Sequence, residues 1–123
     1  MKIKILQING NEVIAQTKIG TLKGLFRSPS VHVLKEYNVE IECEGVVKIE
    51  DIGCVNLKMP SIYSENNIAC FIGFVECVED GVLFLRLIDD LVMFEIEKEA
   101  DCSLFVNRYI KIMVKYVSFY DID

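Results

Sequence analysis

The alternation of apolar and polar positions is clearest between residues 68 and 97. Two short acidic segments, EDG and DD, divide this stretch into three apolar runs, which read IACFIGFVECV, VLFLRLI and LVMFEIE. Val, Ile, Phe and Leu favour strands, whereas Asp and Gly favour turns. The pattern therefore predicts a three-stranded antiparallel meander that supplies much of the core.

Two further strand signals precede this meander. Asn9-Gly10-Asn11 lies between apolar segments at 2–8 and 12–19, and Asn-Gly is the strongest short hairpin signal because both residues tolerate positive φ. Residues 39–44 read VEIECE and alternate strictly. They predict a strand with one buried face and one solvated, acidic face.

The remaining segments have weaker patterns. Glycine and proline make residues 20–38 an expected irregular loop, although a short strand at 31–34 could lie inside it. Residues 61–67, SIYSENN, follow Pro60 and are an expected polar loop. Residues 105–120 predict a last strand with a bulge or barrel corner near its end. A helix over 107–119 is the alternative, because its apolar positions also fit a helical stripe.

These segments amount to about eight short strands without a long amphipathic helix. We therefore predict a single all-β domain over residues 1–123, either an antiparallel β-sandwich or a partly open β-barrel. The apolar fraction of 52% and mean hydropathy of +0.34 favour strands buried on both faces, or a homodimer face. No uncharged run approaches the ~18 residues of a membrane-spanning helix, so no membrane association is expected.

The cysteines and the N-terminal segment indicate a cytoplasmic protein. The first residues, MKIKILQING, resemble a strand rather than a signal peptide. The five cysteines form no CxxC pair and lie in or beside predicted strands, where reduced thiols pack as small apolar groups. They are Cys43, Cys54, Cys70, Cys77 and Cys102.

Motifs that carry catalysis are missing from the sequence. His32 is the only histidine, so a two-histidine metal site cannot form. We find no GxSxG, HExxH, glycine-rich phosphate loop or EF-hand pattern. The sequence therefore predicts a protein that is not an enzyme, with no catalytic residues, no cofactor and no metal.

Charge is distributed unevenly along the chain. Residues 1–35 hold six Lys and Arg against one Glu, whereas residues 36–101 hold sixteen acidic residues against four basic ones. A net charge of −6 keeps an apolar-rich domain soluble, which is one interpretation. However, like charges that face each other on a sheet are destabilising, so a concentrated acidic face favours a role in steering a basic partner.

Our leading hypothesis is a small acidic binding protein that recognises a basic protein partner through an acidic sheet face. A small, acidic, non-enzymatic chain is also the profile of immunity proteins that inhibit a bacterial toxin, although no family motif carries that comparison. The face would form if the strand at 39–44 lies beside the third strand of the meander. The partner-binding residues would be Glu40, Glu42, Glu44, Glu95, Glu97, Glu99 and Asp101.

The alternative hypothesis is an OB-like module that binds nucleic acid or another anionic ligand. If the first and last strands pair when a barrel closes, their lysines share one surface. A pI of about 4.8 repels phosphate at long range, so nucleic acid is the less favoured partner. Edge protection against aggregation would equally explain these lysines, which are Lys2, Lys4, Lys111 and Lys115.

Overall fold

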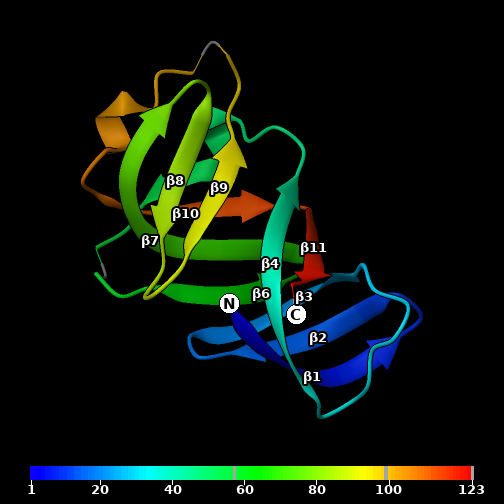
Figure 1. Ribbon diagram of the computed structural model, residues 1–123. Coiled ribbons are helices and arrows are strands. Elements are labelled where there is room, and N and C mark those ends of the chain that lie inside the picture. The colour runs from blue at the N-terminus through cyan, green and yellow to red at the C-terminus, as the bar shows by residue number, and fades with distance from the viewer. Residues whose placement is uncertain (57, 99, 123) are drawn as a thin grey trace.

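A computed structural model describes residues 1–56, 58–98 and 100–122 (Figure 1). Most strands alternate between buried and exposed side chains, as their sequences do. The described residues form two short 3₁₀ helices, η1 (Ile49–Asp51) and η2 (Ser103–Phe105). The strands are β1 (Lys2–Asn9), β2 (Glu12–Thr17), β3 (Gly20–Phe26), β4 (Glu36–Glu44), β5 (Ile52–Cys54), β6 (Ser61–Glu65), β7 (Ile68–Glu79), β8 (Val82–Arg86), β9 (Leu91–Glu95), β10 (Tyr109–Val114) and β11 (Tyr116–Asp121).

Five of these strands close a barrel. Strands β1, β2 and β3 form an antiparallel meander, and β4 pairs with β1 on one side and β11 on the other. The barrel closes because β11 pairs in parallel with the end of β3, through Ser118 opposite Leu25 and Phe119 opposite Phe26. The order around the barrel is therefore β1-β2-β3-β11-β4.

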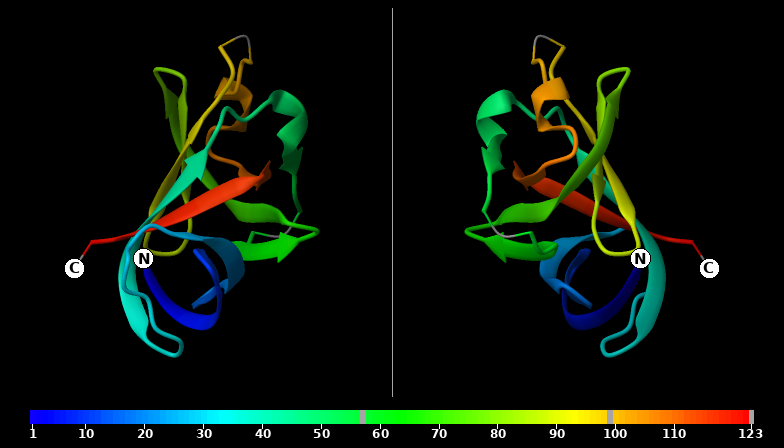
Figure 2. Two further views of the ribbon diagram at one scale, coloured as in Figure 1. Left: turned by 90° about the vertical axis from the view of Figure 1, so that its right-hand side faces the viewer. Right: turned by 90° about the vertical axis from the view of Figure 1, so that its left-hand side faces the viewer.

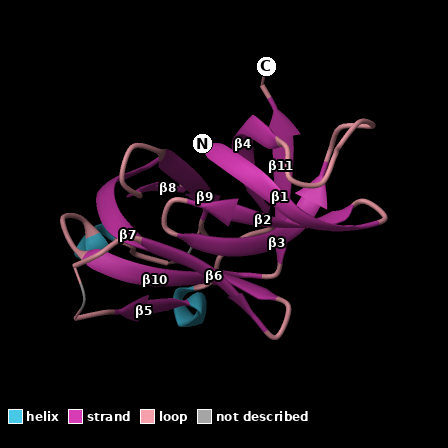
Figure 3. Ribbon diagram, turned by 90° about the horizontal axis from the view of Figure 1, so that it is seen from below, coloured by secondary structure: helices cyan, strands magenta, loops and turns pink. Residues whose placement is uncertain are grey.

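The other strands pack outside this barrel as a second layer (Figures 1 and 2). The start of β3 also pairs in parallel with β6, and the sheet continues through β7 and β10 to β5. The long strand β7 uses its first half for β6 and β10 and its second half for β8. Viewed from below, β6, β7, β10 and β5 lie beside the β1-β2-β3 meander (Figure 3).

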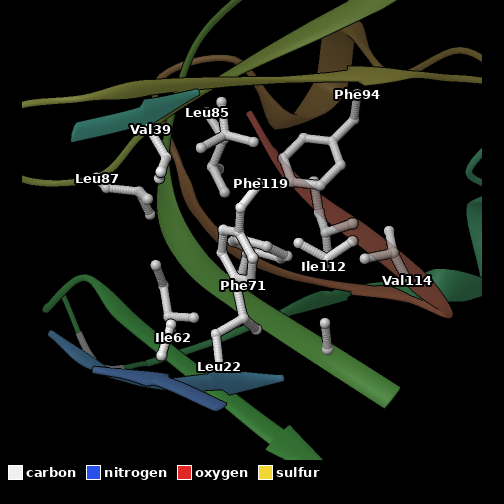
Figure 4. Close-up of a cluster of buried hydrophobic side chains, with 14 of the residues drawn as sticks. Leu22, Val39, Ile62, Phe71, Leu85, Leu87, Phe94, Ile112, Val114 and Phe119 are labelled. Carbon is white, nitrogen blue, oxygen red and sulfur yellow. The ribbon is translucent and has the colours of Figure 1, made fainter. Parts of the chain in front are cut away.

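A single cluster of buried apolar side chains joins the barrel to the second layer (Figure 4). Phe71 of β7 and Phe94 of β9 meet edge to face, with ring centroids 5.4 Å apart. Leu22 and Phe119 enter the same cluster from the barrel. Burial of these large side chains is the main favourable contribution to folding, at roughly 1.5–3 kcal/mol for each.

Two glycines let β3 approach its partners. Gly20 has φ +147°, and a Cβ built there would lie 1.7 Å from the carbonyl oxygen of Ile62. A Cβ on Gly24 would lie 2.6 Å from Cε2 of Phe119 and 2.9 Å from the carbonyl oxygen of Val117. Any side chain at these positions would push β6 or β11 away from β3.

The structure confirms the all-β fold class with barrel and sandwich character. It differs from the expectation in having eleven strands among the described residues and a closed barrel. The predicted meander at 68–97 is present as β7, β8 and β9, and the first hairpin as β1 and β2.

Two segment predictions were wrong, and the alternative helix near the end of the chain is excluded. The expected loop at 20–38 contains β3 and the start of β4, because its glycines permit close strand contacts rather than breaking the strand. The expected loop at 61–67 forms β6, whose Ile62 is buried opposite Phe71. Residues 109–121 form β10 and β11 with a break at Lys115, which excludes the alternative helix.

Substitution of Gly24 by alanine tests the closure of the barrel. We expect Gly24→Ala to lower the free energy of unfolding by about 2 kcal/mol, because the added methyl group would overlap Phe119. Urea denaturation monitored by circular dichroism measures this loss. Gly53→Ala is the matched control, since a Cβ at Gly53 meets no atom within 4 Å. Equal stability of the two variants would contradict the packing described here.

Candidate functional site

Strand β4 presents a row of three glutamates to solvent. Its inward positions include Tyr37 and Val39, which are buried in the barrel, and strict alternation turns the glutamates outward. In register with them on β11 are Tyr120, Ser118 and Tyr116. The outward residues of β4 are Glu40, Glu42 and Glu44.

Strands β4 and β9 lie side by side, as the acidic-face hypothesis requires. Beyond the end of β4, Val47 forms a parallel bridge with Ile96. The Val47 amide donates to the carbonyl oxygen of Glu95 at 2.7 Å, and the Glu97 amide donates to the carbonyl oxygen of Val47 at 3.0 Å. Further along, a cleft between the strands is lined by Glu40 of β4 and Met93 of β9.

The glutamates of this face differ in their partners. Within residues 1–56, 58–98 and 100–122, the side chains of Glu40, Glu42 and Glu95 form no hydrogen bond or ion pair, and all three are exposed. Glu44 instead accepts hydrogen bonds from Arg27 at 3.0 Å and from the Ser118 hydroxyl at 3.1 Å. Arg27 therefore neutralises the Glu44 end of the row, whereas the unpaired Glu40 at the other end lines the cleft.

Two of the predicted acidic residues serve local structure instead. Glu97 is half-buried, and its Oε1 accepts a hydrogen bond from the Ile49 amide at 3.0 Å, which holds η1 against the end of β9. Asp101 accepts hydrogen bonds from the amide and the hydroxyl of Ser103, at 3.1 and 2.5 Å. These bonds lower the pKa of Asp101. The remaining predicted residue, Glu99, lies outside the described residues.

Exposed apolar side chains accompany the free carboxylates, and sequence reasoning missed them. Leu91 and Met93 of β9 are 43% and 52% exposed, and Ile122, just beyond β11, is 58% exposed. All three line the same cleft as Glu40. The alternation of LVMFE does place Leu91 and Met93 opposite the buried Val92 and Phe94, so the signal was present in the sequence.

The predicted basic surface does not form. Strand β1, with Lys2 and Lys4, pairs with β2 and β4, whereas Lys111 on β10 has Gly53 of β5 and Ile72 of β7 as neighbours. The last strand closes against β3 and β4 rather than β1, which separates the two lysine groups. Lys115 follows β10, where it lines a cleft with Tyr116.

Each lysine also has its own neighbour. Lys2 forms an ion pair with Glu36 at 3.2 Å. The ammonium of Lys111 lies 5.5 Å from the centre of the Tyr63 ring, and its hydrogen bond with Tyr63 raises the pKa of the lysine. Lys111 therefore stays charged beside an aromatic ring at neutral pH.

The cysteines are only partly buried, contrary to the expectation. Cys70 and Cys102 are buried, whereas Cys54 and Cys77 are exposed. Burial, followed by the nearby Glu42 carboxylate, raises the pKa of Cys43 to about 12. This thiol is protonated at neutral pH and is a poor nucleophile.

Metal-ligating side chains do not gather in the part of the chain that the structure describes. No three His, Cys, Asp or Glu side chains group there in a way that could hold a metal ion. His32 is exposed, and its ring nitrogen lies 3.4 Å from the hydroxyl of Ser30. Neither helix among the described residues has the length and apolar character needed to cross a membrane.

Comparison of the chain with protein-family models, curated proteins and solved structures gave no significant match.

Removal of the Ser118 hydroxyl tests how firmly Arg27 is held against the acidic row. Ser118 is fully buried, accepts a hydrogen bond from Nε of Arg27 and donates one to Glu44. We expect Ser118→Ala to lower the free energy of unfolding by about 1 kcal/mol, because both partners lose a hydrogen bond. Thermal denaturation measures the change. Ser30→Ala, on an exposed serine, is the control and should be neutral; a neutral Ser118→Ala would contradict this role.

Proposed function

We propose that the chain is a non-enzymatic binding module that recognises a basic protein partner through the outer surface of β4 and β9. The observation that carries this proposal is the combination of free carboxylates with exposed apolar side chains on neighbouring strands. Glu40, Glu42 and Glu95 lack ion-pair partners within the described residues, and Leu91 and Met93 lie on the adjacent strand.

This surface suits a protein partner better than a small ion. Protein interfaces combine an apolar centre with a polar rim, and burial of exposed leucine and methionine supplies affinity. The unpaired carboxylates supply steering, since a surface of one charge sign accelerates encounter with a partner of the opposite sign. A net charge of −6 extends this attraction over the whole molecule.

An immunity-type inhibitor of a basic bacterial toxin is the biological class that this proposal favours. Such an inhibitor needs no catalytic group, and its task is to bind quickly to a basic surface before the toxin acts. Five free thiols support a reducing, cytoplasmic setting for this role.

Charge reversal on the acidic surface tests the proposal. A partner is first recovered by affinity capture from the native host and identified by mass spectrometry. We expect the double variant Glu42→Lys, Glu95→Lys to associate with it about tenfold more slowly, and with a weaker dependence on salt, in stopped-flow measurements. Glu97 is unsuitable for this test because its carboxylate holds the Ile49 amide.

The matched control reverses two acids on strands that pair with neither β4 nor β9, Glu12→Lys on β2 and Glu65→Lys on β6, which change the net charge by the same amount. If the control slows association equally, the net charge alone causes the effect. If the surface variant does not slow association, the proposed surface is refuted. Light scattering of the free protein tests the other occupant, a second copy of the chain. A homodimer that dissociates in Met93→Glu would show that this surface binds itself.

A second candidate function is an OB-like module for an anionic ligand, and one observation supports it. OB-type modules are five-stranded Greek-key barrels that bind oligonucleotides, and five strands of this chain close a barrel. Lys111 beside the Tyr63 ring, on the sheet continuous with that barrel, would provide one cation and one stacking surface.

Titration with a short fluorescent single-stranded oligonucleotide tests the second candidate. At low salt we expect saturable binding that weakens several-fold in Lys111→Ala, because one phosphate contact is lost. Lys58→Ala, which removes an exposed lysine elsewhere, is the control. Anisotropy that does not change on titration would leave the acidic surface as the sole candidate.

A further inference from the structure

The cleft between β4 and β9 forms because the two strands diverge from a fixed point. They are hydrogen-bonded to each other only beyond the end of β4, at Val47 and Ile96, among the described residues. At the other end the start of the chain enters between them, where the Val39 amide donates to the carbonyl oxygen of Met1 at 2.8 Å. Figure 1 shows the N-terminus between β4 and the beginning of β9.

The cleft has apolar walls and a charged rim. Its volume is about 190 Å³, which is room for several water molecules and thus for one long side chain. Ile41 of β4 and Leu91 and Met93 of β9 form its walls, with Ile122 at the edge. Charged groups line it as well: the Asp90 carboxylate is paired with the Met1 amine at 3.2 Å, whereas Glu40 has no hydrogen-bond or ion-pair partner within the described residues.

We infer that this cleft receives an arginine side chain of the partner, whose guanidinium pairs with Glu40. The inference rests on the proposed function and names the anchor of that same surface. An arginine stem can lie along Ile41, Leu91 and Met93 while its planar head reaches the rim and takes a carboxylate on two N–H groups. Arginine is also a frequent hot-spot residue at the centre of protein interfaces.

Other side chains complement the cleft less well. An acidic side chain would be repelled by the unpaired carboxylate of Glu40, and a purely aliphatic one would leave Glu40 desolvated without a partner. A lysine shares the charge, but its ammonium is more strongly hydrated and cannot bind a carboxylate through a planar fork. The apolar walls therefore favour the guanidinium.

Small probes test the inference without the natural partner. The probe is N-acetyl-arginine amide, titrated into ¹⁵N-labelled protein and followed by amide chemical shifts. We expect saturable shifts confined to residues around Ile41, Leu91 and Met93, and about fivefold weaker binding of the neutral citrulline analogue. Shifts spread evenly over all acidic residues, or equal binding of the two probes, would overturn the inference. Tighter binding of N-acetyl-lysine amide would overturn the choice of arginine.

Variants separate the contribution of the rim from that of the walls. Glu40→Gln should weaken binding of the arginine probe about fivefold, whereas Glu79→Gln, an exposed glutamate on another hairpin, should leave it unchanged. Met93→Ala should weaken both the arginine and the citrulline probe, and Leu104→Ala, at an apolar side chain in η2 that is 69% exposed, should affect neither. Unchanged probe binding in both Glu40→Gln and Met93→Ala would refute the site.

The same variants distinguish this inference from the proposed function. If Glu42→Lys, Glu95→Lys slows association with the captured partner while Glu40→Gln and Met93→Ala leave its dissociation rate unchanged, the surface is correct and the arginine anchor is wrong. If the double charge reversal has no effect either, the proposed function itself fails. An increase of about fivefold or more in the dissociation rate of Glu40→Gln supports both.

Discussion

The fold depends on one strand edge that is divided between two partners. The start of β3 pairs with β6 and the end of β3 pairs with β11, both in parallel. Gly20 and Gly24 make the two contacts possible, because a Cβ at either position would overlap the partner strand. The first contact attaches the second layer and the second closes the barrel. The strands between β4 and β11 along the chain thereby form the second layer, and its Phe71 and Phe94 belong to the core that the two layers share.

The candidate surface is a consequence of how β4 pairs with its neighbours. Strand β4 must pair with β11 over residues 39–44 to complete the barrel, and its other edge pairs with β1 only over residues 36–38. The rest of that edge faces β9, which pairs with β8 on its far side. Over residues 39–44, β4 has a partner on one side only, as β9 does, and among the described residues the two segments are bridged at Val47 and Ile96 alone. Leu91 and Met93 are exposed because they alternate with the buried Val92 and Phe94, and the gap between the two strands beside them forms the cleft.

Local patterns in the sequence predicted what depends on local chemistry. Alternation in VEIECE and in the meander, together with Asn9-Gly10, predicted β4, β7, β8, β9 and the first hairpin, and the acidic face of β4 with them. The same reasoning failed where pairing is remote. Gly20 and Gly24 were interpreted as strand breakers. Their contact residues, Ile62 and Phe119, are more than forty and more than ninety residues away along the chain. A parallel contact between such distant segments leaves no periodic signal in the sequence. The first strand was also expected to pair with the last. Instead β11 pairs with β3 and β4, so the lysines of β1 and the lysine of β10 lie in different parts of the sheet.

The role of individual carboxylates also depends on neighbours that the sequence does not specify. Glu42 and Glu44 are two residues apart on one face, yet only Glu44 is held, because Arg27 leaves β3 at the point where β11 brings Ser118 beside it. Glu97 is drawn inward by the Ile49 amide for a similar reason. The exposed and unpaired glutamates among the described residues of this surface are Glu40, Glu42 and Glu95, and Glu40 lines the cleft. Exposed charges alone accelerate encounter but add little affinity, since water and salt screen each pair. A cleft can remove one such charge pair from water and cover it with aliphatic side chains. Burial of this kind slows dissociation, which exposed charges alone do not do. The geometry around Glu40 thus favours a surface that both attracts a basic partner and retains it.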